Sequence, residues 1–261
     1  SANDRPVRSN EDLTAAIEAA GGAPLTVVYR RSGARHTATL TPTADENGHY
    51  KAGVWVRDSG AGIGTMSFVD PQRGTFAGLG HSISDADTGA DLTLLSGEIV
   101  PVTITGCIRG AAGSPGELRG EFAAAPAGTV LANDAAGVYG SYTGSCTAPA
   151  LPVANLQEVT PGEAELWTTV LGTTAQPYTI QVERVTMTGS DPNRNLLIRV
   201  TDKRLLDATG GVVQGMSGSP IVQNGRLAAV LTHVLVNDPS RGYAIFATTM
   251  LEKADAVASS K

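Results

Sequence analysis

The sequence predicts a mainly β protein built as a barrel or a pair of barrels. Three observations predict this class. The chain of 261 residues contains 31 glycines and 14 prolines, which is typical of many turns between short strands. From Lys51 onward, short apolar runs alternate with turn signals such as Asn224-Gly225. Helical periodicity is confined to two segments, 11–20 and 249–259.

The first 44 residues form a small separate segment in this prediction. Residues 1–8 are polar and expected to be disordered, and Ser9 offers an N-cap to the helix over 11–20. Strands are expected over 25–31 and 36–40, before a polar linker at 42–48. Helix, strand, turn and strand in this order resemble the second half of a PDZ domain. The segment 1–44 is therefore expected to be a partial PDZ domain without its carboxylate-binding loop.

Residues 45–261 are expected to form one β domain closed by the helix at 249–259. The hairpin at Asn224-Gly225 has the strongest local signal, since this pair fits a tight primed turn. The predicted strands are 53–57, 64–68, 75–78, 92–100, 102–108, 138–140, 165–171, 179–187, 196–200, 221–223, 226–231 and 243–247.

Charge and composition exclude several classes of function. The formal net charge of −6 argues against a nucleic-acid partner, because phosphate binding requires a basic face. No apolar run approaches the roughly 18 residues of a membrane span, and no signal-type segment opens the chain. Cys107 and Cys146 leave two alternatives open, one disulfide or two free thiols. Neither cysteine has a Cys or His within four positions, so a Cys/His metal site is not expected.

A glycine-rich turn at 214–220 carries the main candidate for chemistry. Its Gly-x-Ser-Gly-x-Pro pattern is typical of the nucleophile turn in serine peptidases with chymotrypsin-like barrels, which makes Ser217 the candidate nucleophile. The N–H groups of Gly215 and Ser217 are the expected oxyanion hole. The alternative is a β-turn whose serines only cap backbone groups.

Two of the four histidines are candidates for the general base. His81 follows a predicted strand in a glycine-framed loop, a common position for catalytic groups. His233 is the rival, but its setting is that of a strand interior, which favours a core or supporting position. His36 and His49 are expected on the surface.

The third member of a triad would be a carboxylate that orients the base. Asp202 ends the predicted strand 196–200, and the order His81, Asp202, Ser217 is that of chymotrypsin-like enzymes. Only 15 residues separate Asp202 from Ser217, which departs from the usual spacing. The competitor, Asp207, is expected in a helical turn.

An acidic stretch after His81 suggests a metal site only weakly. Asp85, Asp87 and Asp91 resemble a calcium loop, but a glycine comes at the fifth position instead of the sixth, and Ser96 stands at the twelfth. A metallohydrolase that uses His81 with these acids is a second alternative. The favoured interpretation is a solvated turn, and no metal or cofactor is expected.

Several stretches, taken together, resemble one known family, the SpoIVB peptidases. The similarity runs from about Pro6 to Leu251. It is carried by 53–59, 62–65, 78–85, 87–89, 96–100, 113–118, 210–220 and 232–239.

The resemblance implies a chymotrypsin-like double β-barrel over 45–261 preceded by a PDZ domain. It also implies a catalytic triad of His81, Asp202 and Ser217, and a serine endopeptidase that processes its own N-terminus. The implied substrate is the extracytoplasmic part of a membrane-anchored regulator protein. The implied location is outside the cytoplasm, between the forespore and mother-cell membranes. The alternative from another class is a non-catalytic PDZ-linked adaptor on a protease-like barrel.

Overall fold

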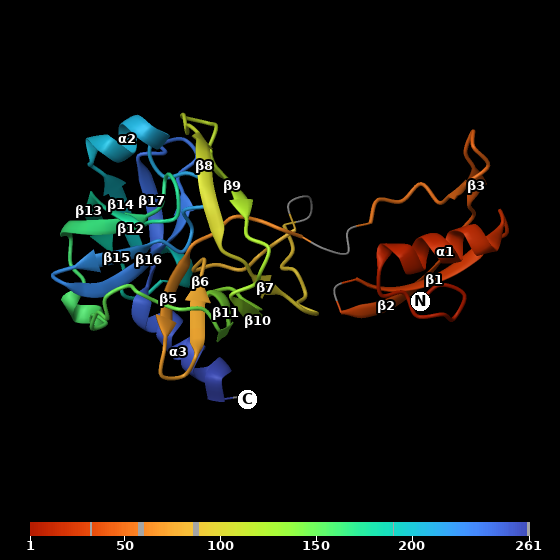
Figure 1. The fold of residues 1–261 in the computed structure, drawn as a ribbon, viewed down its shortest axis with the longest axis horizontal. Helices are drawn as coiled ribbons and strands as arrows, with labels where there is room; N and C mark the ends of the chain where they lie inside the picture. The colour runs from red at the N-terminus through yellow and green to blue at the C-terminus, as the bar shows by residue number, and fades with distance from the viewer. Residues whose placement is uncertain (32, 57–59, 86–88, 190, 260–261) are drawn as a thin grey trace. The chain divides into compact units, whose positions relative to one another are not determined.

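The computed structural model describes residues 1–31, 33–56, 60–85, 89–189 and 191–259. Contacts divide the chain into two compact units, Ser1–Ala61 and Gly62–Lys261. The mainly β class is confirmed (Figure 1).

The first unit packs one helix on a two-stranded sheet. Helix α1 (Asn10–Ala20) begins where Ser9 Oγ accepts a hydrogen bond from the N–H of Asp12 (3.2 Å), and it ends at a left-handed Gly21. The antiparallel strands β1 (Leu25–Arg31) and β2 (Ala34–Leu40) follow, then the small hairpin of β3 (Thr43–Ala44) and β4 (Tyr50–Lys51).

Two expectations for this region differ from the structure. Residues 1–8 are not disordered: Ala2 is fully buried, and the Asn3 carboxamide oxygen accepts a hydrogen bond from the N–H of Thr26 (2.9 Å). The domain boundary was expected at 44/45, whereas the contacts place it after Ala61. The later boundary arises because Tyr50 packs on the apolar cluster around Ile17 and so ties the β3–β4 hairpin to the first unit.

The second unit has a closed half and an open half (Figure 1). The closed half is a six-stranded antiparallel barrel. Its strands, in spatial order, are β12 (Gly162–Thr168), β13 (Gln176–Val185), β14 (Leu196–Val200), β17 (Arg241–Phe246), β16 (Arg226–Val234) and β15 (Pro220–Gln223). The hairpin predicted at Asn224-Gly225 joins β15 to β16 with positive φ at both residues, as a primed turn requires.

The other half is an open five-stranded sheet among the described residues. Its strands, in order, are β5 (Met66–Asp70), β6 (Thr75–Gly78), β11 (Gly137–Tyr142), β10 (Gly128–Asp134) and β7 (Glu98–Ile99). A separate hairpin, formed by β8 (Val102–Ile108) and β9 (Glu117–Phe122), lies between β7 and β10 in the sequence. Of the strand expected over 92–100, only β7 forms, and β9 and β10 were not predicted.

Helix α3 (Ala247–Ser259) joins the two halves. Met250 and Ala254 of α3 pack in one buried cluster with Ala77 and Tyr139 of the open sheet and with barrel residues Val230 and Ile245. Burying this apolar surface on both sides stabilises the junction, because each fully buried large side chain contributes about 1.5–3 kcal/mol.

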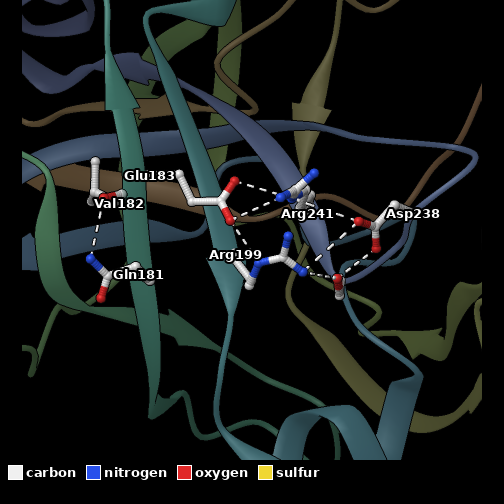
Figure 2. A network of polar contacts seen from close by, with 7 residues as sticks. Gln181, Val182, Glu183, Arg199, Asp238 and Arg241 are labelled. Carbon is white, nitrogen blue, oxygen red and sulfur yellow. Dashed lines mark hydrogen bonds and ion pairs between the residues drawn. The ribbon is translucent and has the colours of Figure 1, made fainter.

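A charged network spans the outside of the barrel (Figure 2). Glu183 on β13 accepts hydrogen bonds from Arg199 Nε on β14 (2.6 Å) and Arg241 Nη2 on β17 (3.2 Å), and Asp238 is paired with both arginines at 3.6–3.9 Å. Partial burial raises the pKa of Glu183, but the hydrogen bonds from the two arginines outweigh it and hold the pKa below its usual range. The network ties neighbouring strands together beside the loop that contains Asp238.

Both cysteines are free thiols, Cys107 partly buried and Cys146 exposed. Within the described ranges, no helix is long and apolar enough to cross a membrane.

Candidate active site

The turn that carries Ser217 is anchored on both sides of the serine. Met216 is fully buried in the barrel core, and the N–H of Gly218 donates to the carbonyl of Leu231 on β16 (2.8 Å). Gly218 has a φ of +97°, and a Cβ there would lie 1.9 Å from the carbonyl oxygen of Thr65. Only glycine fits this position, which explains one glycine of the motif.

The Ser217 hydroxyl is partly accessible and points at the barrel. Its Oγ donates a hydrogen bond to the carbonyl oxygen of Thr232 (2.7 Å). Its neighbour Ser219 is fully buried, and the Ser219 Oγ lies 3.5 Å from Thr65 Oγ1. Of the two serines in the motif, Ser217 is therefore the one that a substrate can reach.

The two predicted oxyanion donors are available. In the described part of the chain, the N–H groups of Gly215 and Ser217 donate no hydrogen bond, although the carbonyls of both residues are bonded. Thr65 accounts for both of those bonds: its N–H donates to the Ser217 carbonyl (2.8 Å) and its Oγ1 donates to the Gly215 carbonyl (3.2 Å). Free N–H groups beside a serine hydroxyl are what an oxyanion hole requires.

His81 lies in the loop that follows β6. Gly80 before it has a φ of +69°, and a Cβ there would lie 2.9 Å from Thr232 Cγ2. The His81 Nδ1 lies 2.7 Å from the carbonyl oxygen of Ser82. Since a carbonyl only accepts, this contact assigns the proton of the neutral ring to Nδ1 and leaves Nε2 as the acceptor that a general base needs.

The loop after His81 is fastened to the open sheet. The Asn133 side chain on β10 accepts from the N–H of Ile83 (2.7 Å) and donates to the carbonyls of Ile83 (3.1 Å) and Leu92 (3.0 Å). Asn133 therefore clamps both ends of the loop.

His233, the rival base, lies on β16 against His81. The two ring centroids are 4.9 Å apart, with 34° between the planes. The pKa of His233 is lowered to about 4, mainly by burial and also by the nearby charges of His81 and Arg194, against the opposing effect of Asp191. At neutral pH the His233 ring is uncharged.

Asp202 has a different set of partners. It caps helix α2 (Lys203–Thr209): its Oδ1 accepts from the N–H of Arg204 (2.8 Å), and its Oδ2 accepts from Arg204 Nη2 (2.7 Å) and the Thr179 N–H (3.3 Å). The hydrogen bond from the Arg204 side chain is the main reason that the pKa of Asp202 falls to about 2, against a smaller opposing effect of burial.

The strand register explains why Asp202 lies away from Thr232 and His81. Leu231 and Leu196 both pair with Ala244 of β17, so the Thr232 region lies level with the start of β14. Val200, where β14 ends, is about 13 Å further along the strand, and Asp202 comes after it. No hydrogen bond or ion pair between described residues joins Asp202 to His81.

In the acidic stretch after His81, Asp91 is held by two serine hydroxyls. Asp91 accepts hydrogen bonds from the hydroxyls of Ser82 (2.5 Å) and Ser84 (3.0 Å), which lower the pKa of its carboxyl. Asp87 lies outside the described residues. The described residues hold no group of three or more His, Cys, Asp or Glu side chains with the geometry of a metal site.

Ser217 and His81 thus meet at one strand. Thr232 accepts the Ser217 hydroxyl and contacts the Gly80 backbone, and His233 contacts the His81 ring. No hydrogen bond links Ser217 directly to His81 in the part of the chain that the structure describes. The sequence analysis missed Thr65, Thr232 and Asn133, although Thr65 and Thr232 lie in the segments that carry the family resemblance.

One family profile and several solved protease structures match this chain. The profile of the SpoIVB peptidase S55 family matches residues 48–251. The active form of the Rv3671c protease from M. tuberculosis is 16% identical, with 61% of this chain and 79% of that chain covered and a TM-score of 0.37. The HtrA-type protease AlgW with a decapeptide is 13% identical, with 75% and 62% covered and a TM-score of 0.38. The comparison with curated proteins finds no match.

Proposed function

Since the chain belongs to the SpoIVB peptidase S55 family, we propose that it cleaves peptide bonds with Ser217 as nucleophile and His81 as general base. Family membership makes the chain a serine endopeptidase. The observation that carries the residue assignment is the convergence of both side chains on Thr232 and His233 of β16.

Acyl transfer begins at the Ser217 hydroxyl. The hydroxyl leaves the Thr232 carbonyl, gives its proton to Nε2 of His81, and its oxygen attacks the substrate carbonyl carbon. The Ser82 carbonyl holds the Nδ1–H of the resulting imidazolium. His81 then delivers the proton to the leaving amine, and water releases the acyl group by the reverse sequence.

Charge that develops on the substrate oxygen is met by two backbone groups. The N–H groups of Gly215 and Ser217 are unpaired in the described residues, so they can bind the tetrahedral oxyanion without breaking an existing hydrogen bond. Losing one such donor in a serine peptidase costs about 10²- to 10³-fold in kcat.

The third triad position stays a prediction from the family resemblance. That resemblance assigns it to Asp202, whereas the contacts of Asp202 are those of a helix cap and an arginine pair. Asp202 would act on His81 only after leaving Arg204.

The proposal extends to the substrate and the location. A peptidase acts on protein, and the family resemblance supports the extracytoplasmic part of a membrane-anchored regulator as the target. It also supports export across the forespore membrane and N-terminal self-processing. Incubating a purified regulator ectodomain with wild-type chain and with Ser217→Ala tests the substrate, since only wild type should cut it.

Active-site phosphonylation tests the residue assignment. A fluorophosphonate should add one adduct to the wild-type chain and to Ser219→Ala, and none to Ser217→Ala, by intact mass. Ser219 is the matched control because it lies in the same motif but is fully buried. An adduct that persists in Ser217→Ala would contradict the proposal.

A further inference from the structure

We propose that His233 is a positioning residue for His81, holding the general base through ring contact from the barrel side. This inference rests on the proposed function, because it needs His81 to act as the base. It gives a role to a second histidine that the acyl-transfer steps above do not use.

The contact has the geometry of a packed aromatic pair. The ring centroids of His81 and His233 are 4.9 Å apart, and the planes are tilted by 34°. Aromatic pairs are favourable at centroid separations of about 4.5–7 Å. The His233 ring therefore covers one side of the His81 ring and limits its rotation.

His233 lies on the part of β16 that is paired with β17. β15 pairs with β16 only as far as Val230, whereas His233 is in register with Tyr243 of β17, directly after a shift in register between Leu231 and His233. The residue before it, Thr232, accepts the Ser217 hydroxyl and is fixed by contacts of its own Oγ1 with the carbonyls of Asn193 (2.6 Å) and Tyr243 (3.0 Å). Two successive residues of one strand thus contact the nucleophile and the base.

Within the described ranges, one hydrogen bond fixes the His81 ring besides the contact with His233. The Ser82 carbonyl fixes Nδ1, but it belongs to the same loop and moves with it. No carboxylate among the described residues forms an ion pair with His81. The His233 ring is therefore the contact that relates the His81 ring to the barrel, where Ser217 is anchored.

The charge state of His233 suits this role. The charged groups that act on it are His81, Arg194 and Asp191, and together with burial, the largest effect, they lower its pKa to about 4. An uncharged ring can lie against His81 when His81 becomes an imidazolium, whereas a second positive charge would repel it. Its buried Nδ1 has no hydrogen-bond partner among the described residues, so no polar contact of that atom explains its position.

The test compares phosphonylation rates of folded variants. In His233→Ala the second-order rate constant for labelling Ser217 should fall about 10- to 100-fold, since displacing a catalytic group by about 1 Å costs on that order. In His233→Phe, which keeps a ring at this position, the rate should return to within about fivefold of wild type. His36→Ala is the matched control, because His36 is also stacked on an aromatic ring, that of Tyr29 at 5.4 Å, but lies in the first unit.

Thermal unfolding of each variant confirms that rates are compared in folded protein. Rescue by phenylalanine separates ring positioning from a need for the imidazole nitrogens. The inference is overturned if His233→Ala is labelled at the wild-type rate, or if His233→Phe is as slow as His233→Ala. A wild-type chain that takes no label at all would instead overturn the proposed function, so the two failures are distinguishable.

Discussion

The nucleophile and the base come from halves of the Gly62–Lys261 unit that are built differently. Ser217 directly follows Met216, which is buried in the core of the closed barrel. Each strand of that barrel has two neighbours. His81 lies in a loop that leaves the open five-stranded sheet and is held there by Asn133. The barrel fixes its serine from within, whereas the open half has to hold its histidine through side-chain contacts.

The two halves meet at a small number of contacts around the site. Thr65, before β5 of the open half, bonds the carbonyls of Gly215 and Ser217, and Gly80 packs against Thr232. Activity should therefore depend on residues of the junction as well as on the reacting groups.

Removing the base from the open half should have the largest effect on rate. His81→Ala should lower the rate of Ser217 phosphonylation about 10²- to 10⁴-fold, the usual contribution of general-base catalysis. Thermal unfolding should change little, because the side chain is partly exposed and its hydrogen bond stays within its own loop. An unchanged labelling rate would show that another group activates Ser217.

The second-largest effect should come from adding a side chain at the junction between the two halves. Gly218→Ala would place a Cβ 1.9 Å from the Thr65 carbonyl at a φ of +97°, so the two halves must separate locally. We expect a loss of about 3 kcal/mol or more in the free energy of unfolding, measured by urea denaturation, together with loss of labelling. Gly225→Ala is the control: its φ is also positive, but nothing lies within 4 Å, so it should cost only about 1 kcal/mol.

Asp202 should contribute more to the stability of the fold than to the labelling rate. Asp202→Ala removes the N-cap of α2 and should lower the free energy of unfolding by about 1–2 kcal/mol. The folded-state pKa of Asp202 is about 2, below its ordinary value near 3.8. Its contribution to stability is therefore present above about pH 4 and is lost as the pH falls towards 2, which urea denaturation at several pH values should show.

The labelling rate of folded Asp202→Ala separates the two roles of this residue. The contacts in the structure predict a rate within about tenfold of wild type. A loss of 10³-fold or more in folded protein would instead show that the carboxylate acts on His81, as the family resemblance implies.

The smallest effect should come from a single junction hydrogen bond. Thr65→Val keeps the shape of the side chain but removes the Oγ1 bond to the Gly215 carbonyl. We expect a loss of about 1 kcal/mol in stability and a labelling rate a few-fold lower, because the Gly215 N–H is then less well held. A rate equal to wild type would show that the Thr65 N–H bond to Ser217 is sufficient.

Much of the fold follows from local sequence pattern. The strands Leu25–Arg31, Thr75–Gly78, Val102–Ile108 and Leu196–Val200 have the predicted bounds, since their apolar residues are flanked by clear turn signals. Strands β9 and β10 were not predicted because their residues are mostly partly or fully exposed and lack a continuous apolar run. Residues 1–8 are ordered because Ala2 pairs with Val27 of β1, and composition does not reveal this contact.

The site could also be predicted only in part, because it depends on contacts between residues that are distant in sequence. The motifs identify Ser217 and His81 as candidates, but their common contact with β16 depends on residues distant in sequence. An Asp at a strand end is compatible with both a triad acid and an N-cap, and the Asp202-Lys203-Arg204 sequence does not distinguish them. Contact with His81 distinguishes His233 from an ordinary strand residue, and only the fold shows that contact.

The most direct measurement of the central claim is a crystal structure of the phosphonylated chain. We expect phosphorus on Ser217 Oγ, with one phosphonyl oxygen about 2.7–3.1 Å from the N–H nitrogens of both Gly215 and Ser217. We also expect the His81 Nε2 within hydrogen-bond distance of the serine oxygen, with the His233 ring still against His81. Phosphorus on another residue, or an adduct on Ser217 with His81 out of reach, would contradict the claim that a barrel serine is activated by a histidine of the open half.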